Sequence, residues 1–290
     1  MILIADSGST KCDWLLIDEK GERLNEYRSI GLNPYFHSAD FIAKTLSENT
    51  EMMLTAKDIE KVYFYGAGAS TSRLCKIIEE GLASVFVNAE VIVDHDLVGA
   101  AYSVYDGRTN ITCIIGTGSN SCRFDGKEVY EEVPALAYIL GDEASGSYFG
   151  KMLIANYFYK RLPEELMKRF EETYHLTKDD MIDAVYKKDN ANVYLASYMK
   201  FFTQNGGHPL LREWVKEGIR KFIDIHVKCF DNWKELPVHF IGSVGYYFED
   251  TLKAVCKEEG VHLGTIIKKP VYTLADYHVK YIFAKKQENV

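Results

Sequence analysis

Short apolar runs that end in polar turns divide the first hundred residues into elements typical of an α/β protein. Runs of the strand type cover residues 2–5, 14–17, 61–65 and 91–93. The first two flank a polar turn and predict a β-hairpin, which residues 23–29 extend to three strands. Helical periodicity covers residues 38–53, 70–85 and 97–105. This part of the chain is therefore predicted to form one α/β lobe.

The same order of elements begins again near residue 110. A second hairpin is predicted at residues 110–124, and residues 127–130 add a strand after an Asp-Gly turn. A strand at residues 238–241, a Gly-rich turn and a helix at residues 246–259 follow much later, before a last strand near residue 265. The matching turns lie farther apart in this half, which indicates an insertion at about residues 141–231. Its helical patterns cover residues 148–159, 163–172, 178–186 and 211–231.

This repeated order predicts a duplicated α/β fold, with two similar lobes of mixed β-sheet flanked by helices. The first lobe is predicted to comprise residues 1–107 and a C-terminal helix at about residues 275–290. The second lobe comprises residues 108–274 and carries the helical insertion. Ligands are expected to bind between the two lobes.

Composition narrows the partners of such a protein. The 290 residues exceed what one compact domain usually needs, and 47% of them are hydrophobic, so each lobe can bury a core. The net charge of −8, without a basic cluster, argues against nucleic acid. No apolar stretch reaches the roughly 18 residues of a membrane span, and no basic region precedes the first apolar run. A cytoplasmic protein without a membrane partner is expected, and its six scattered cysteines are expected to be reduced.

Three turns rich in Gly, Ser and Thr are candidates for binding phosphate. Each follows an apolar strand, small residues let the backbone approach an anion, and successive N–H groups can bind phosphate oxygens. The candidate residues are Ser7, Gly8, Ser9, Thr10 and Lys11; Gly116, Thr117, Gly118 and Ser119; and Gly242, Ser243, Val244 and Gly245. None of the turns is a P-loop. Glycine and serine are common in turns of every kind, which is enough to explain any one of these turns alone. It explains three such turns in matching positions less well.

Acidic residues next to these turns are candidates for the chemistry. Asp6 directly follows the first strand and can hold Mg²⁺ or its water shell, although an aspartate that stabilises the turn is the alternative. Asp94 and Asp96 precede a helix, where capping is the simple explanation. Phosphoryl transfer to a hydroxyl needs a carboxylate that orients the acceptor and takes its proton, and Asp96 suits that role. The acidic turn at residues 141–146 suits sugar hydroxyls, or is simply a loop before a helix.

Together these stretches resemble the superfamily of actin-like sugar kinases and chaperone ATPases. More narrowly, they are similar to the BadF/BadG/BcrA/BcrD-type ATPases that include N-acetylglucosamine kinase. The matching motifs are ADSGSTKCDW (5–14) and IIGTGSNS (114–121) for the phosphate loops, LGDEASGSYFG (140–150) for the GDEGS motif, IGSVGYYF (241–248) for the adenosine motif and DLVGAA (96–101) for the catalytic aspartate. Their order and separations make the combination specific.

The resemblance implies two actin-like, ribonuclease H-like lobes and an ATP-dependent kinase for N-acetylglucosamine or a related amino sugar. ATP would lie between the lobes with Mg²⁺ at Asp6 and its adenosine along Gly242 to Gly245. Asp96 would be the general base, and the sugar would contact Asn33, Gly141, Asp142 and Asp96. The C-terminal segment would return as a helix to the first lobe. A small-molecule sugar substrate and a homodimer are expected as partners.

Two positions depart from the family pattern, and two other functions compete. Ala144 replaces the usual glycine of GDEGS, and Ser243 stands where a Gly-Gly pair is common. One competing function is an ATPase that activates a partner redox enzyme through an iron-sulfur cluster held by paired cysteines, of which this chain shows no obvious example. The other is a nucleotide sensor or a filament protein of the actin type, which the position of Asp96 makes less favourable.

Overall fold

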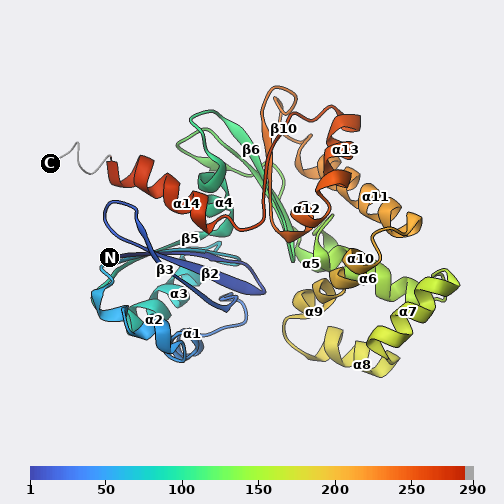
Figure 1. Ribbon diagram of the computed structural model, residues 1–290, viewed down its shortest axis with the longest axis horizontal. Helices are drawn as coiled ribbons and strands as arrows, with labels where there is room; N and C mark the ends of the chain where they lie inside the picture. The colour runs from blue at the N-terminus through green and yellow to red at the C-terminus, as the bar shows by residue number, and fades with distance from the viewer. Residues whose placement is uncertain (285–290) are drawn as a thin grey trace. The chain divides into compact units, whose positions relative to one another are not determined.

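The computed structural model describes residues 1–284, and contacts within the chain divide it into two compact units (Figure 1). Among the described residues, the first unit comprises residues 1–112, 122–130 and 267–284. The second comprises residues 113–121 and 131–266. The lobe boundaries expected from the sequence stay a prediction, and residues 285–290 of the expected C-terminal helix lie outside the described residues.

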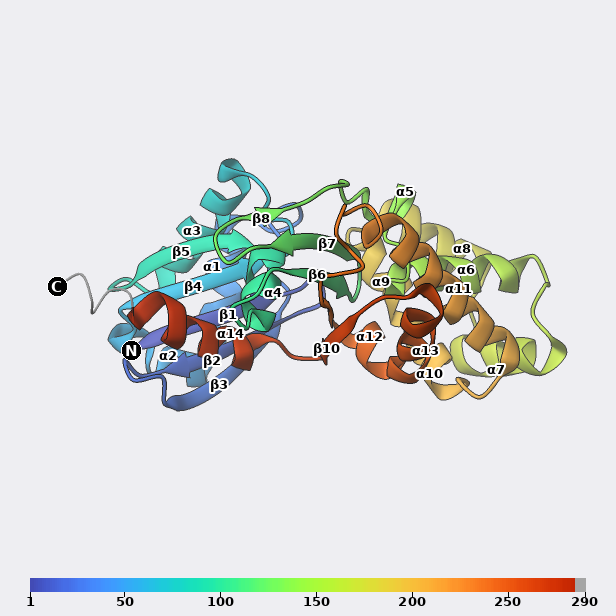
Figure 2. The same ribbon diagram turned by 90° about the horizontal axis from the view of Figure 1, so that it is seen from above.

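The first sheet has five strands in the order β3-β2-β1-β4-β5 (Figure 2). Its strands are β1 (Ile2–Ser7), β2 (Lys11–Ile17), β3 (Arg23–Ile30), β4 (Lys61–Gly66) and β5 (Glu90–His95). The first three pair antiparallel, which confirms the predicted three-stranded hairpin arrangement. β4 runs parallel to β1, and β5 runs parallel to β4. The carboxyl ends of β1, β4 and β5 therefore meet at one edge of the sheet, where ligands of α/β proteins usually bind.

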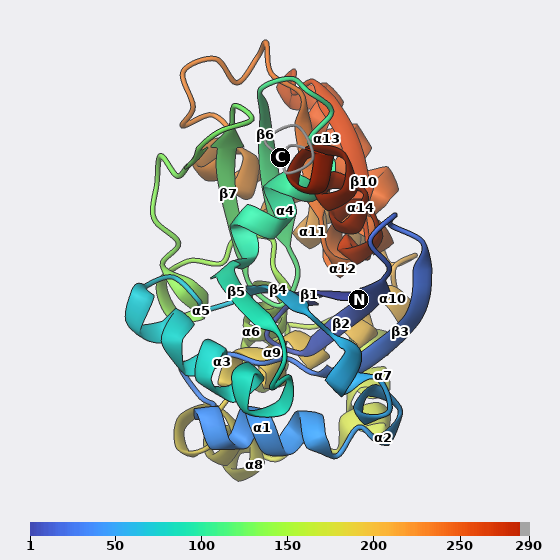
Figure 3. The same cartoon turned by 90° about the vertical axis from the view of Figure 1, so that its left-hand side faces the viewer.

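Helices cover both faces of this sheet (Figure 3). On one face, Leu3 and Ala5 of β1 pack in a buried cluster with Ile42, Leu46 and Ile78 from the helices below. On the other face, Ile2 and Ile4 pack against the C-terminal helix. Both faces of β1 are therefore buried, which is why its sequence is a continuous apolar run instead of an alternating one. The helices of this unit are α1 (Ala39–Ser47), α2 (Thr50–Met53), η1 (Ala56–Asp58), α3 (Ser72–Val85), α4 (Asp96–Val104), α14 (Val271–Tyr277) and η3 (His278–Phe283).

The helix predicted over residues 38–53 is wrong in one respect, because the structure divides it into α1 and α2. α1 ends at Ser47, and the Asn49 side chain then accepts a hydrogen bond from the Met52 backbone N–H, so that Asn49 caps a new helix. Asparagine favours this capping position over a helix interior, which explains the break.

The second sheet has the order β10-β9-β6-β7-β8, and its strands repeat the topology of the first. They are β6 (Asn110–Ile115), β7 (Ser119–Phe124), β8 (Val129–Tyr130), β9 (Val238–Ile241) and β10 (Leu263–Ile267). In each sheet the first strand of a hairpin is central, with the other hairpin strand on one side and the later strands on the other. This shared order confirms the predicted duplication. β8 is shorter than predicted because Asp125 accepts hydrogen bonds from the Lys127 and Glu128 backbones and extends the turn.

The insertion is helical, as predicted, and its helices gather in the second unit (Figure 1). They are α5 (Ala137–Leu140), α6 (Gly146–Phe158), α7 (Glu164–Tyr174), α8 (Lys178–Ile182), η2 (Asp183–Lys187), α9 (Ala191–Ser197), α10 (Met199–Gln204) and α11 (Pro209–His226). Neither α9 nor α10 is predicted from the sequence. The predicted helix at 246–259 forms as two pieces, α12 (Ser243–Tyr247) and α13 (Glu249–Glu259). No helix of the described residues is long and apolar enough to span a membrane.

Candidate functional site

The carboxyl edge of the first sheet brings two predicted site residues together. Asp6 of β1 lies opposite Tyr65 of β4, and Tyr65 lies opposite Asp94 of β5. Since the three strands end in register, Asp96 at the start of α4 follows at the same edge. The two carboxylates are close enough for the charge of Asp96 to raise the pKa of Asp6. The structure therefore places the predicted metal ligand and the predicted general base at one site.

The Asp6 carboxyl group lies in an unfavourable environment for a negative charge. Burial raises its pKa to about 7, with further upward contributions from Asp96 and Asp13, while Lys11 acts in the opposite direction. Near neutral pH this aspartate is thus poised between its protonated and ionised forms. A bound cation would relieve the repulsion between the carboxylates, which fits a metal-binding role.

Asp96 is the first residue of α4. The N-cap position is His95, whose side chain makes no capping hydrogen bond, so neither aspartate occupies the N-cap position. The Asp94 carboxylate instead accepts a hydrogen bond from the His95 backbone N–H at 2.8 Å. The Asp96 carboxylate lies 3.2 Å from the His95 Nε2 atom. At Gly99 a Cβ would lie 2.6 Å from the Tyr65 Cβ, so α4 packs closely on β4 and fixes the position of Asp96.

The first Gly/Ser turn packs closely against residues 31–33. A Cβ at Gly31 would lie 2.1 Å from the Gly8 carbonyl oxygen, so only glycine fits there. The Leu32 backbone N–H donates to the buried Ser7 hydroxyl at 3.0 Å. Asn33, which is 7% exposed, accepts a hydrogen bond from the Tyr35 backbone and lies against Gly68, in the turn after β4. Asn33, which is predicted to bind the sugar, thus lies beside a turn at the carboxyl edge of the sheet.

Lys11, a predicted phosphate ligand, pairs with a buried carboxylate of its own strand. Its ammonium group contacts Asp13, which also accepts a hydrogen bond from Arg28 Nε at 3.1 Å. These two cations lower the pKa of Asp13 even though burial acts to raise it. The Lys11 side chain is 46% exposed. Its charge is therefore available near the turn but is partly neutralised.

The second Gly/Ser turn, at residues 116–119, is bound to the start of α6. The Gly116 and Thr117 carbonyl groups accept hydrogen bonds from the Gly146 and Ser147 backbone N–H groups, at 2.8 and 3.1 Å. The Ser119 hydroxyl donates to the Glu143 carbonyl at 2.7 Å. The structure therefore joins two motifs that the sequence separates by more than twenty residues into one substructure of the second unit.

Asp142 links the same two motifs through its carboxylate. The Ser119 backbone N–H donates to Asp142 Oδ1 at 3.2 Å, and the Ser147 hydroxyl donates to Oδ2 at 3.3 Å. Burial raises the pKa of Asp142, while these hydrogen bonds and Lys151 oppose the shift. Asp142 and Ala144 both have a positive φ, 58° and 59°. Glycine adopts this conformation most easily, which explains why glycine is usual at position 144.

A buried pair, Glu143 and His226, stands behind this turn and was not predicted from the sequence. The Glu143 Oε2 atom lies 3.4 Å from His226 Nε2, and Oε1 lies 3.5 Å from Lys221 Nζ. Burial lowers the pKa of His226, and Glu143 opposes that shift. The His226 carbonyl also accepts a hydrogen bond from the Ser121 hydroxyl at 2.6 Å. His226 ends α11 far along the chain, so no local pattern pointed to this contact.

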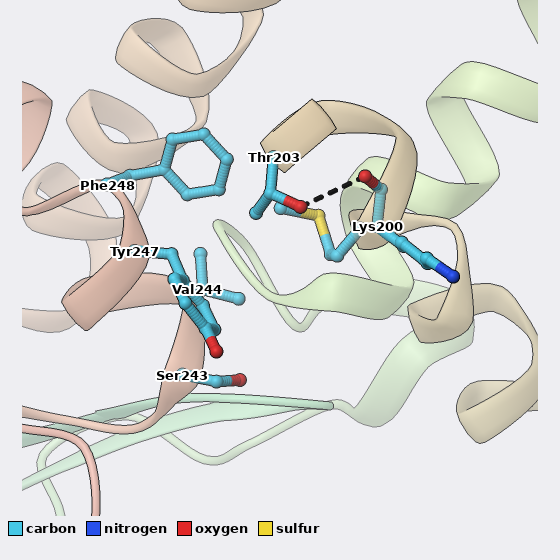
Figure 4. Close-up of a pocket in the computed structure, with 7 residues that line it drawn as sticks. Lys200, Thr203, Ser243, Val244, Tyr247 and Phe248 are labelled. Carbon is cyan, nitrogen blue, oxygen red and sulfur yellow. Dashed lines mark hydrogen bonds between the residues drawn. The ribbon is translucent and has the colours of Figure 1, made fainter. Parts of the chain in front are cut away.

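The third Gly/Ser turn borders a pocket of about 270 Å³ between α10 and α12 (Figure 4). The lining residues are Met199, Lys200, Thr203, Ser243, Val244, Tyr247 and Phe248. Two of the four predicted adenosine ligands, Ser243 and Val244, line it. Gly242 and Gly245 instead lie against Ile115, where a Cβ would come within 2.5 Å of the Ile115 carbonyl oxygen and 3.0 Å of its side chain. The wall formed by α10 was not predicted.

Comparison with solved structures shows what the chain resembles. A proposed N-acetylglucosamine kinase from Porphyromonas gingivalis is 36% identical over 97% of this chain and all of its own, with a TM-score of 0.90. A second one, from Chromobacterium violaceum, is 15% identical over 95% of this chain and 98% of its own, with a TM-score of 0.67. A ROK family glucokinase from Streptomyces griseus, solved with glucose and AMPPNP, is 14% identical over the same shares of the two chains, with a TM-score of 0.54.

These likenesses confirm the predicted fold class, with two five-stranded mixed sheets flanked by helices as in actin-like sugar kinases. The two more distant structures bear on the fold alone. No family model matches the chain, and no curated protein matches it. Its narrower placement among the BadF/BcrA-type ATPases therefore stays a prediction.

Proposed function

We propose a function from the family to which this chain belongs, that of the proposed N-acetylglucosamine kinase of Porphyromonas gingivalis: the chain transfers the terminal phosphoryl group of ATP to a sugar hydroxyl. The observation that carries the proposal is the placement of Asp96 beside Asp6 at the carboxyl edge of the first sheet. One carboxylate at that edge can bind a cation that accompanies phosphate, and the other can act on the acceptor.

The sugar that we propose is N-acetylglucosamine or a related amino sugar. The buried polar side chains of Asn33 and Asp142 support a ligand with many hydroxyl and amide groups. Gly141 would bring its backbone to the same ligand. Because Asp142 already accepts hydrogen bonds from Ser119 and Ser147, its carboxylate is held in one orientation before a sugar arrives.

Asp96 would act as the general base. It orients the sugar hydroxyl and accepts its proton as the sugar oxygen forms a bond to the γ-phosphorus and the bond to the bridging oxygen of ADP breaks. The rest of the catalysis is positioning and stabilisation of charge. The backbone N–H groups of Gly8, Gly116 and Ser119 already donate within the protein, so other N–H groups of the turns at residues 7–11 and 116–119 would bind phosphate oxygens.

The residues at this edge fit Mg²⁺. Asp6 is a half-buried carboxyl group whose pKa is raised next to Asp96, and Mg²⁺ is usually held by one or two carboxylates together with substrate phosphates. Among the described residues, no group of three or more His, Cys, Asp or Glu side chains forms a metal site by itself. When bound, Mg²⁺ neutralises charge on the phosphate oxygens. Asp6 would hold it there.

Replacement of Asp96 by asparagine tests the proposal. Asp96→Asn should lower kcat for phosphorylation of N-acetylglucosamine by at least about 100-fold, because the base that takes the proton is lost. ATP binding, measured by calorimetry, should stay within about threefold. The matched control is Asp94→Asn, which changes an exposed carboxylate two residues earlier and should leave kcat within about threefold. Full turnover by Asp96→Asn would contradict the assignment.

A panel of hexoses, N-acetylhexosamines and muramic acid derivatives identifies the acceptor sugar. Sedimentation equilibrium tests the homodimer that we also propose.

The alternative function, activation of a redox partner, finds no support in the described residues. No disulfide joins the six cysteines, all of which lie among the described residues, and four of them are buried. Iron in anaerobically purified protein would revive that alternative.

A further inference from the structure

The pocket between α10 and α12 has walls suited to a flat apolar ligand. Val244 is buried beneath it, while Tyr247 is 56% exposed and Phe248 is half-buried at its side. Figure 4 shows Phe248 pointing toward Thr203 of the opposite helix, with Tyr247 and Val244 below. An exposed aromatic side chain next to a half-buried one at a hollow offers apolar surface to a ligand.

The polar groups of this pocket are few and simple. The Thr203 hydroxyl donates its hydrogen to the Lys200 carbonyl oxygen at 3.0 Å, so toward a ligand it can only accept. The Lys200 ammonium group points away from Val244 and Phe248 (Figure 4). Ser243 and Tyr247 carry hydroxyl groups, which both donate and accept hydrogen bonds and adapt to either partner.

The side chains that distinguish adenine from guanine are missing from the lining. Asparagine or glutamine binds adenine through two hydrogen bonds, and guanine needs acceptors for its ring N–H and amino groups, which carboxylates supply. Among the described residues that line the pocket, none is Asp, Glu, Asn or Gln. Apolar contact and stacking remain, and every purine has a flat face on which both act.

The resemblance implies that the adenosine of ATP lies beside this pocket, and we propose that the pocket holds the purine ring by stacking and apolar contact without distinguishing adenine from guanine, so that GTP serves as phosphoryl donor nearly as well as ATP. The inference rests on the proposed kinase function and specifies its nucleotide. Pyrimidine nucleotides should bind less well, because their single ring covers less of the aromatic surface.

Calorimetry with the full chain tests the pocket without any turnover. AMPPNP and GMPPNP should bind with dissociation constants within about tenfold of each other, and CTP at least about tenfold more weakly than ATP. Preference for AMPPNP over GMPPNP by more than 100-fold would overturn the inference, and so would equal binding of CTP. Comparable binding of both purines without phosphorylation of any sugar would instead contradict the proposed function and leave the pocket assignment intact.

Variants of the lining residues show whether the purine base of the nucleotide lies in this pocket. Tyr247→Ala should weaken AMPPNP and GMPPNP by the same factor, about tenfold, and should fold normally because the side chain is largely exposed. Phe248→Ala should weaken both nucleotides in the same way. Tyr186→Ala, which removes an equally large side chain that is 77% exposed elsewhere in the same unit, is the matched control and should change neither affinity. Unchanged binding by both pocket variants would overturn the proposal.

Discussion

Asp6 at the end of β1 and Asp142 in the turn before α6 each lie next to a Gly/Ser turn of their own half, yet their surroundings differ. Burial raises the pKa of both carboxyl groups. Asp6 adds repulsion from Asp96 and Asp13, whereas Asp142 receives hydrogen bonds from Ser119 and Ser147. Asp6 thus lies where its negative charge is unfavourable and a cation would relieve it, whereas Asp142 uses its carboxylate to hold two backbone segments together. The two halves share their strand order but place these carboxylates in different surroundings.

The largest effect is expected from Asp6→Asn, which should make the protein more stable while it lowers activity. The folded-state pKa of Asp6, about 7, lies above its ordinary value of 3.8, so folding favours the protonated form. Ionised Asp6 therefore lowers the free energy of unfolding. This loss is small below pH 4, grows between pH 4 and pH 7, and is complete above pH 7. Removing the carboxylate should therefore stabilise the fold at pH 8 on the order of 3 kcal/mol, and much less at pH 4.5.

Urea denaturation in EDTA at the two pH values measures this gain. Asp58→Asn removes an exposed carboxylate of the same unit and should change the free energy of unfolding by less than about 0.5 kcal/mol at either pH. An equal gain for Asp6→Asn at both pH values would show that the buried charge of Asp6 is not its source.

The opposite sign is expected for Asp142→Ala. This change leaves the Ser119 N–H and the Ser147 hydroxyl without their acceptor in a buried turn, which should cost about 2 kcal/mol of stability. Asp142→Asn keeps an oxygen acceptor and should lose less. Thermal unfolding compares the two variants with the wild-type protein. If Asp142→Ala were as stable as the wild type, the structural role of this carboxylate would be wrong.

The smallest effect is expected where the acidic turn departs from its family pattern. Ala144→Gly should change the free energy of unfolding by less than about 0.5 kcal/mol. Glycine removes the strain of an alanine in the left-handed conformation, but it also loses a buried methyl group and gives the unfolded chain more freedom, so these effects largely cancel. Ala101→Gly in α4 is matched for burial but helical, and should cost about 1–2 kcal/mol. Urea denaturation compares the two variants. If both lost the same free energy of unfolding, Ala144 would not be strained by its left-handed backbone conformation.

Much of this fold could be predicted because its strands are continuous apolar runs that end at glycine or aspartate. The run before Asp6 and the runs before Gly116 and Gly242 each formed the expected strand. Helix boundaries were less certain, since the capping bond of Asn49 depends on one side chain and Phe248 interrupts an otherwise regular pattern.

The candidate site was predictable only where its residues lie in local motifs. Register in a parallel sheet places Asp96 near Asp6, two residues that the motifs indicated separately. The wall of the pocket at Thr203 lies in α10, a short helix of mixed aromatic and polar residues without clear periodicity. The pairing of Glu143 with His226 depends on packing between elements 83 residues apart, which no local pattern encodes.

The hydrogen bonds from Gly146 and Ser147 to Gly116 and Thr117 restrict how this protein can be re-engineered. Because both carbonyl groups of the turn are already satisfied by the first amides of α6, that helix and the turn form a single rigid piece. A chimera that grafts a relative's helical insertion onto this scaffold therefore has to keep the first residues of that helix in register with residues 116–119. A graft that breaks between them would leave two carbonyl groups without donors.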